Sequence, residues 1–224
     1  MNRSFLILLM VGTALMIAVI GNRPRPVMPG YMPWEVKVLD NGNTRIFGIT
    51  LGKTRIQDAN QILSSFPDNR IERDAQKQPG LYAVYEQLNL GGFLVRLELE
   101  YDLDAQQLQM ITGDVAAEDT IDLPQQLDDN EQMQLLNSTV RSIRYIPQVD
   151  YTEALLLQHF GQPEQREHQG NHHYWRYPAI GLSIDIDDQG PDIFSYHRVE
   201  PPPTTQNTPA AEPEAPETAN QPAS

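Results

Sequence analysis

The chain has 224 residues, with 16 Lys and Arg, 30 Asp and Glu and no cysteine, for a formal net charge of −14. Without thiols it forms no disulfide, uses no thiolate chemistry and carries no lipidated cysteine. The acidic balance disfavours nucleic acid as a ligand, because binding it requires a basic surface that neutralises phosphates. An acidic domain is also repelled by anionic lipid, so we assign any membrane contact to an apolar segment of the chain.

The chain begins with an apolar segment: residues 5–20 contain no charged side chain. A membrane-spanning helix needs about 17–25 residues, whereas a signal peptide has a shorter apolar stretch and a small-residue cleavage site. No clean cleavage site follows, so we predict that residues 1–22 form a signal anchor, with a cleaved signal peptide as the alternative. The protein is then expected to be single-pass in a bacterial inner membrane, with its soluble domain in the periplasm. Residues 23–43 are rich in proline and predict an extended stalk.

Residues 44–113 predict a first α+β unit. The alternating pattern from Arg45 to Leu51 predicts a strand that ends at Gly52. A helix is expected to begin at Thr54, because Thr54 and Gln57 have capping-box spacing and apolar residues then recur at helical intervals. The strands expected after this helix form a meander over residues 82–88, 93–101 and 107–111.

Residues 114–139 form an acidic connector, with a short helix expected over residues 127–139. Residues 140–199 predict a second α+β unit in the same order. Its helix is expected to begin at Asp150, which has capping-box spacing to Glu153, and its strands are expected over residues 174–177, 181–187 and 193–199. The tail, residues 200–224, is acidic and rich in proline, without aromatic or branched aliphatic side chains, and predicts disorder.

The motifs GITLGKT (residues 48–54) and FGQP (residues 160–163), with their strand, helix and meander context, resemble two known folds. One is the small outer-membrane assembly lipoprotein family BamE (SmpA/OmlA), and the other is the related β-lactamase-inhibitor-protein fold, which uses two tandem copies. The resemblance covers residues 46–111 and 140–199. It implies an α+β fold of two tandem units, each a short helix packed on an antiparallel meander, after an N-terminal transmembrane helix. The chain departs from BamE by lacking the lipobox cysteine and by carrying an anchor and two units.

Four carboxylates alternate with apolar residues near the end of the first predicted unit. On a strand they would share one face, while the apolar side chains face the core. We interpret this row as the solvated face of a sheet, with a surface for cations or a basic partner as the alternative. The residues are Glu98, Glu100, Asp102 and Asp104.

Three histidines, His168, His172 and His173, form the densest histidine cluster of the chain. A zinc site requires further ligands and a scaffold that orients them. Gly170 argues for a loop between His168 and His172, and His173 would point away from His172 on a strand. We therefore predict surface histidines and no metal site, with a divalent-metal sensor or hydrolase as the alternative.

The clearest candidates for a partner-binding surface are Tyr174, Trp175, Arg176 and Tyr177. On a strand Trp175 and Tyr177 share one face, and Tyr174 and Arg176 share the other. One pair is expected to pack in the core or at its edge. The other pair is a candidate binding surface, because aromatic residues and arginine often anchor protein interfaces.

Catalytic motifs are not found: the sequence has no G-x-S-x-G elbow, no P-loop and no dinucleotide-binding glycine motif after a strand. We therefore predict no enzyme, no catalytic residue and no cofactor. The expected function is a non-enzymatic, membrane-anchored envelope protein that binds another envelope protein and no nucleic acid. The alternative is an inhibitor or small-ligand-binding protein that uses the concave face of its sheet.

Overall fold

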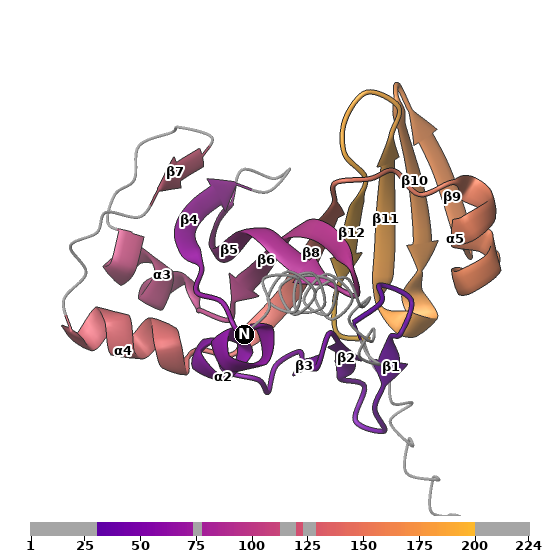
Figure 1. The fold of residues 1–224 in the computed structure, drawn as a ribbon. Coiled ribbons are helices and arrows are strands. Elements are labelled where there is room, and N and C mark those ends of the chain that lie inside the picture. Colours follow the sequence, from indigo (N-terminus) through magenta and orange to yellow (C-terminus); the bar gives the residue numbers. More distant parts are fainter. Residues whose placement is uncertain (1–30, 74–77, 113–119, 123–128, 200–224) are drawn as a thin grey trace, which may run out of the picture.

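The computed structural model describes residues 31–73, 78–112, 120–122 and 129–199 (Figure 1). The predicted signal anchor over residues 1–22 and the tail over residues 200–224 lie outside these ranges. Within the described part of the chain, no helix has both the length and the apolar character needed to cross a membrane.

The described strands form two antiparallel sheets. The larger has the order β7-β4-β5-β6-β8-β12-β11-β10-β9, so β8 joins a first group of strands to a second. Its strands are β4 (Asp68–Arg73), β5 (Pro79–Leu90), β6 (Phe93–Tyr101), β7 (Thr120–Asp122), β8 (Val140–Pro147), β9 (Gln165–Gln169), β10 (His172–Tyr177), β11 (Leu182–Asp187) and β12 (Ile193–Tyr196). The smaller sheet contains β1 (Lys37–Val38), β2 (Thr44–Ile46) and β3 (Ile49–Thr50).

The helices lie at the two ends of the larger sheet. Figure 1 shows α2, α3 and α4 gathered near β4–β6, and α5 beside β9 and β10. Each of α2 and α5 is followed in the chain by an antiparallel meander, β4-β5-β6 after α2 and β9-β10-β11-β12 after α5. The α+β class is therefore confirmed. The helices are α2 (Ile56–Leu63), α3 (Ala105–Thr112), α4 (Asp129–Asn137) and α5 (Glu153–Phe160), with a 3-10 turn η1 (Pro178–Ile180).

The core lies on the side of the sheet that faces the helices, and its centre is aromatic. The ring of Tyr145 on β8 lies 5.3 Å from that of Phe47 and 5.6 Å from that of Phe194, and all three side chains are buried. Such ring pairs contribute about 0.5–1.5 kcal/mol each beyond the burial of their area. The buried hydroxyl of Tyr145 is satisfied by the hydroxyl of Tyr151, 2.8 Å away.

The end of the predicted stalk, residues 23–43, packs against this core. Trp34 stacks on His159 of α5 with 3.8 Å between ring centroids, and the Tyr196 hydroxyl donates a 2.7 Å hydrogen bond to the Pro33 carbonyl. The described part of the stalk therefore belongs to the folded domain.

The single strand predicted from Arg45 to Leu51 is wrong, because the chain reverses within it to form the β2–β3 hairpin. The turn places Phe47 (φ 53°) and Gly48 (φ 79°) in the left-handed region. A Cβ on Gly48 would lie 3.1 Å from a side-chain methyl of Ile62, so glycine is needed there for both space and conformation. The apolar and polar alternation from Arg45 to Leu51 does not indicate one strand here, because the turn between β2 and β3 directs Phe47 into the core.

The strand predicted over residues 107–111 is also wrong, because this segment lies in helix α3. Asp104 and Gln107 form a reciprocal cap. The Gln107 N–H donates to the Asp104 carboxylate at 2.8 Å, and the Asp104 N–H donates to the Gln107 side chain at 2.9 Å. This is capping-box geometry, which starts a helix and not a strand. The helix expected over residues 127–139 is confirmed as α4.

Helices α2 and α5 begin close to the predicted positions but use other caps. The N-cap of α2 is Arg55, and Thr54 instead accepts a hydrogen bond from the Thr50 N–H at 2.9 Å. The N-cap of α5 is Thr152 and not Asp150, and its hydroxyl accepts the N–H three residues further on. Both capping-box predictions are therefore wrong in detail, whereas the presence of the helices is confirmed.

Strands β4 and β9 were not predicted. Their sequences, DNRIER and QREHQ, contain one large apolar residue between them, Ile71, so they lack the alternation that predicts a strand. β4 pairs with β5 and β9 pairs with β10, so tertiary pairing imposes their conformation. β9 forms one edge of the sheet, and all five of its residues are exposed.

Candidate functional site

The four predicted partner-binding residues lie on β10 and separate onto its two faces. Trp175 and Tyr177 are 4% and 5% exposed and face the core, whereas Tyr174 is half-buried and Arg176 is exposed on the opposite face. The predicted separation is confirmed, and it identifies the buried pair. Only Tyr174 and Arg176 are therefore available to a partner.

The buried pair holds α5 against the outer strands. The guanidinium of Arg166 on β9 lies over the Trp175 ring, 4.3 Å from its centroid, and forms a 3.0 Å ion pair with Glu153 on α5. The Tyr177 hydroxyl donates a 3.1 Å hydrogen bond to the carbonyl of Gly161, which ends α5. Trp175 and Tyr177 thus have structural contacts. The role of Arg166 was not predicted, because β9 itself was not predicted.

On the opposite face, which we call the outer face, Tyr174 and Arg176 have polar neighbours. The ring of His172 stacks on Tyr174 with 5.8 Å between centroids, and its Nδ1 lies 3.0 Å from the Asp185 carboxylate. Arg176 has an ion-pair contact of 3.8 Å with Glu167. The hydrogen bond with Asp185, together with its negative charge, raises the pKa of His172 above its usual value of 6.5.

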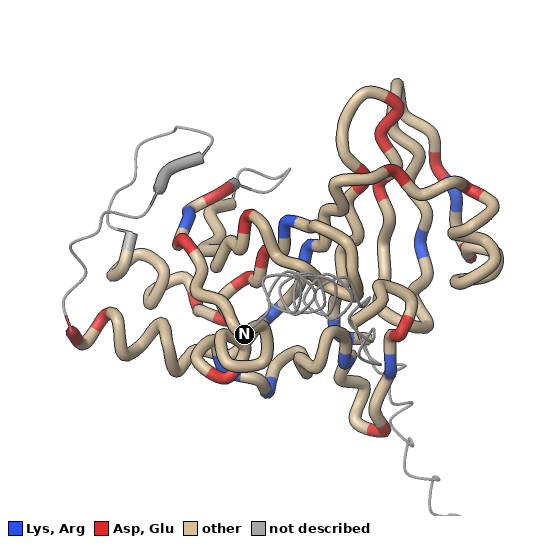
Figure 2. Tube along the Cα trace, viewed as in Figure 1, with Lys and Arg blue, Asp and Glu red and all other residues tan. Residues whose placement is uncertain are grey.

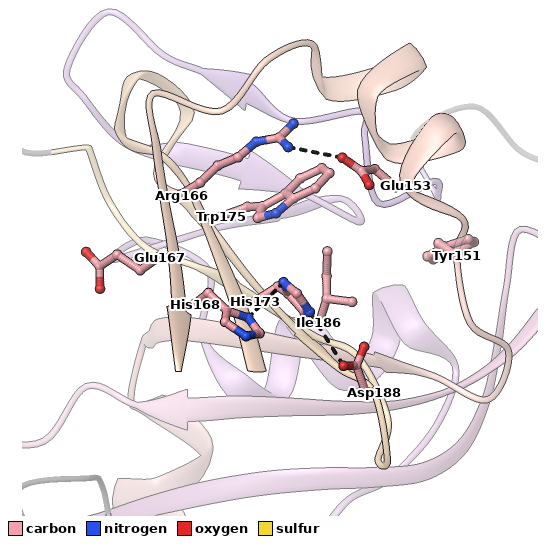
Figure 3. Close-up of a pocket in the computed structure, with 9 residues that line it drawn as sticks. All are labelled: Tyr151, Glu153, Arg166, Glu167, His168, His173, Trp175, Ile186 and Asp188. Atoms are coloured by element: carbon pink, nitrogen blue, oxygen red, sulfur yellow. Dashed lines mark hydrogen bonds and ion pairs between the residues drawn. The ribbon is translucent and has the colours of Figure 1, made fainter. Parts of the chain in front are cut away.

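A cavity of about 310 Å³ lies on the inner side of β9 and β10, near the start of α5 (Figure 3). Its volume is at the lower end of the range of about 300–1,000 Å³ found for small-ligand sites. Its lining combines apolar rings and chains with charged groups: Tyr151, Glu153, Arg166, Glu167, His168, His173, Trp175, Ile186 and Asp188.

Two of the three clustered histidines meet in this cavity. His168 and His173 are directly paired across β9 and β10, and their Nδ1 atoms lie 3.2 Å apart. His172 lies on the outer face, so the three histidines do not converge. Over the described ranges, no group of three or more His, Cys, Asp or Glu side chains has an arrangement that could hold a metal ion.

The predicted row of solvated carboxylates is wrong for Glu98, which is 2% exposed. Its carboxylate forms ion pairs with Arg96 at 2.5 Å and with Arg144 on β8 at 2.7 Å. Burial, with the nearby charge of Glu72, raises the pKa of Glu98 even though both arginines favour its ionised form. Burial alone would lower the pKa of Arg144, but attraction by Glu98 and Glu72 raises it.

The other carboxylates of this row also have defined contacts. Glu100 accepts a 2.6 Å hydrogen bond from the Ser142 hydroxyl, and Asp102 pairs with Arg141 at 3.0 Å. Asp104 caps α3, as described above. These carboxylates therefore make defined contacts within the fold.

Ion pairs continue across the outer face of strands β4, β5, β6 and β8. Figure 2 shows basic and acidic positions interleaved in this part of the molecule. Arg144 also lies over the ring of Tyr82, 4.2 Å from its centroid, and burial raises the pKa of Tyr82 to about 12. We call this set the ion network; its members are Arg70, Glu72, Glu86, Arg96, Glu98 and Arg144.

Comparison of the chain with protein-family models, with curated proteins and with solved structures finds no match. The resemblance to BamE and to the β-lactamase-inhibitor-protein fold therefore stays a prediction from the motifs.

Proposed function

We propose that this chain is a non-enzymatic protein-interaction module, held at the inner membrane of a bacterial envelope by residues 1–22, with its folded part in the periplasm. Its partner is another envelope protein. The anchor and the location rest on the apolar character of the first residues and on the acidic composition of the rest.

The observation that carries this proposal is that the half-buried Tyr174 and the exposed Arg176 lie together on the outer face of β10. Aromatic and arginine side chains are enriched among the residues that dominate protein–protein binding. Their strand is fixed by pairing with β9 and β11 and by the buried Trp175, so the two side chains are presented on a rigid element. A preorganised surface loses less entropy on binding than a mobile one.

The test is cross-linking of the full-length protein in native membranes, followed by its purification. Tyr174→Ala and Arg176→Ala should each reduce recovery of a specific envelope protein, and the double variant should abolish it. Phe66→Ala and Lys53→Ala are matched controls, because both residues are exposed on other parts of the fold. Recovery that depends on Phe66 and not on Tyr174 would contradict the proposed surface.

One observation favours the alternative of small-ligand binding, namely the cavity lined by Trp175 and Ile186. This cavity lies on the core-facing side of β9 and β10. The alternative, in contrast, predicted a ligand site on the concave face of the sheet. Ligand entry would alter the environment of Trp175, so a change in tryptophan fluorescence reports it. The change should persist in Trp34→Phe and disappear in Trp175→Phe.

We also infer that the two helix–meander segments are copies of one unit. The support is their shared order, since α2 precedes β4-β5-β6 and α5 precedes β9-β10-β11-β12, with β8 between the two groups in the sheet. If the second segment is a unit of its own, a chain that lacks residues 44–113 should retain the native antiparallel pairing of β9 to β12. Hydrogen exchange of those amides measures this.

A further inference from the structure

We propose that His168 and His173 form a two-histidine site for a divalent transition-metal ion at the β9–β10 edge of the sheet. The site is independent of the outer face assigned to a partner, because both histidines lie on the inner face. The ion belongs to the class that imidazole binds well, namely Cu²⁺, Ni²⁺ or Zn²⁺.

The first support is the pairing of the two strands. His168 and His173 are directly opposite each other in the antiparallel register, so their side chains leave the sheet on the same face. Directly opposite residues have Cβ atoms about 4.5–5.5 Å apart. The backbone therefore places both imidazoles within reach of one ion.

The second support is the distance between the two ring nitrogens. The Nδ1 atoms lie 3.2 Å apart, with the rings 4.4 Å apart and tilted by 40°. Two imidazole nitrogens that bind one tetrahedral ion, with metal–nitrogen bonds of about 2.0–2.1 Å, are about 3.3 Å apart. The observed separation fits a chelating pair without rearrangement of the strands.

The third support is the surrounding charge. Asp188 Oδ2 lies 3.6 Å from Nε2 of His173, the nitrogen that points away from His168. A negative charge beside the pair favours a bound cation. Of the charged side chains on the inner side of the cavity, Glu153 is paired with Arg166, and Asp188 is the carboxylate beside the histidine pair.

Because no third protein ligand converges with this pair within the described ranges, the remaining coordination positions face the cavity. Water or a ligand from another molecule would occupy them. Figure 3 shows the two imidazole rings side by side, with Asp188 beside His173. A site with two protein ligands and open positions binds an exchangeable ion and not a permanent structural one.

The test is titration of the full-length protein, in detergent and without a histidine tag, with Cu²⁺ alone. Cu²⁺ is the divalent ion of highest affinity for such ligands. One equivalent should bind, with an electron paramagnetic resonance spectrum that shows coupling to two nitrogens. His168→Asn and His173→Asn should each weaken Cu²⁺ binding about tenfold or more. Loss of a group that is only hydrogen-bonded to a metal ligand already lowers metal affinity by about 10–100-fold. His172→Asn is the matched control and should leave the affinity unchanged.

Three outcomes would overturn the site: no binding of Cu²⁺, equal loss in the His172 control, or unchanged binding in the double variant of His168 and His173. In each case the 3.2 Å contact is a hydrogen bond between two imidazoles and nothing more. A further measurement uses the unaltered chain, so its result does not depend on whether a variant folds. Sub-stoichiometric Cu²⁺ should broaden the ring resonances of His168 and His173 before those of His172.

Discussion

The two halves of the large sheet use their outer faces differently. Across β4, β5, β6 and β8 the charged side chains contact one another, and Glu98 is almost fully buried between Arg96 and Arg144. Across β9, β10 and β11 they form single, exposed pairs, such as the 3.8 Å contact of Arg176 with Glu167. Removal of one partner from a buried charge is costly, whereas exposed groups on a rigid strand remain available to a partner.

The largest expected effect is in the first half, at Arg144. Arg144→Met should lower the free energy of unfolding by about 2–4 kcal/mol, because it leaves the buried Glu98 carboxylate with less compensating charge. Adding Glu98→Gln should recover part of this loss, because the uncompensated charge is then removed. Urea denaturation of the single and double variants measures the coupling. Losses that add without recovery would show that the two residues act independently.

A smaller effect is expected at the ion pair between Arg166 and Glu153, which lies on the inner face of the second half and is more exposed than the ion network. Arg166→Met should cost about 1 kcal/mol, since exposed salt bridges contribute about 0–1 kcal/mol and cation–π contacts about 0.5–1 kcal/mol at exposed sites. Methionine keeps an apolar chain over Trp175. The same denaturation experiment tests this value. A loss as large as that of Arg144→Met would show that this more exposed ion pair is as important for stability as the buried pairs of the ion network.

The outer face of β10 should contribute little to stability. Arg176→Ala should change the free energy of unfolding by no more than about 0.5 kcal/mol, as is usual for exposed positions, and Tyr174→Ala by about 1 kcal/mol, because Tyr174 is half-buried and stacks on His172. Thermal unfolding provides the measurement. A loss above about 2 kcal/mol for either variant would mean that the residue is structural, and any loss of partner binding would then have another explanation.

The smallest effect concerns pH. The pKa of His172 is raised by Asp185, so the folded state holds this proton more tightly than the unfolded state. The contribution of the pair to stability is therefore fully present below pH 6.5 and is lost as the pH rises through the pKa of the folded state. A ring-resonance titration should give a pKa above 6.5, and Asp185→Asn should lower it. An unchanged value in that variant would remove Asp185 as the cause.

The sequence predicted those parts of the fold that have regular apolar spacing. β6 was predicted with its observed bounds, 93–101, and α5 was expected from its apolar spacing, although its cap is Thr152 and not Asp150. β4 and β9 were missed because they take strand conformation by pairing with β5 and β10, and their own polar sequences do not indicate it. The turn at Phe47 was missed because a left-handed phenylalanine is an uncommon conformation that no local pattern marks.

For the candidate site, the sequence predicted which residues of β10 share a face. That prediction required only that successive side chains of a strand point to opposite faces. The approach of Arg166 to Trp175, and that of His168 to His173, depends on the register of β9 against β10. Register is a long-range property, so neither contact could be read from the spacing of residues.

The measurement that tests the interaction surface most directly is photo-cross-linking in cells, with a photoreactive amino acid in place of Tyr174 in one variant and in place of Glu86 in another. Glu86 belongs to the ion network and is 41% exposed, so both positions reach solvent. The proposed function predicts a discrete adduct with an envelope protein from position 174 and none from position 86. An adduct from position 86 alone would place the interaction surface on the first half of the sheet and contradict the assignment.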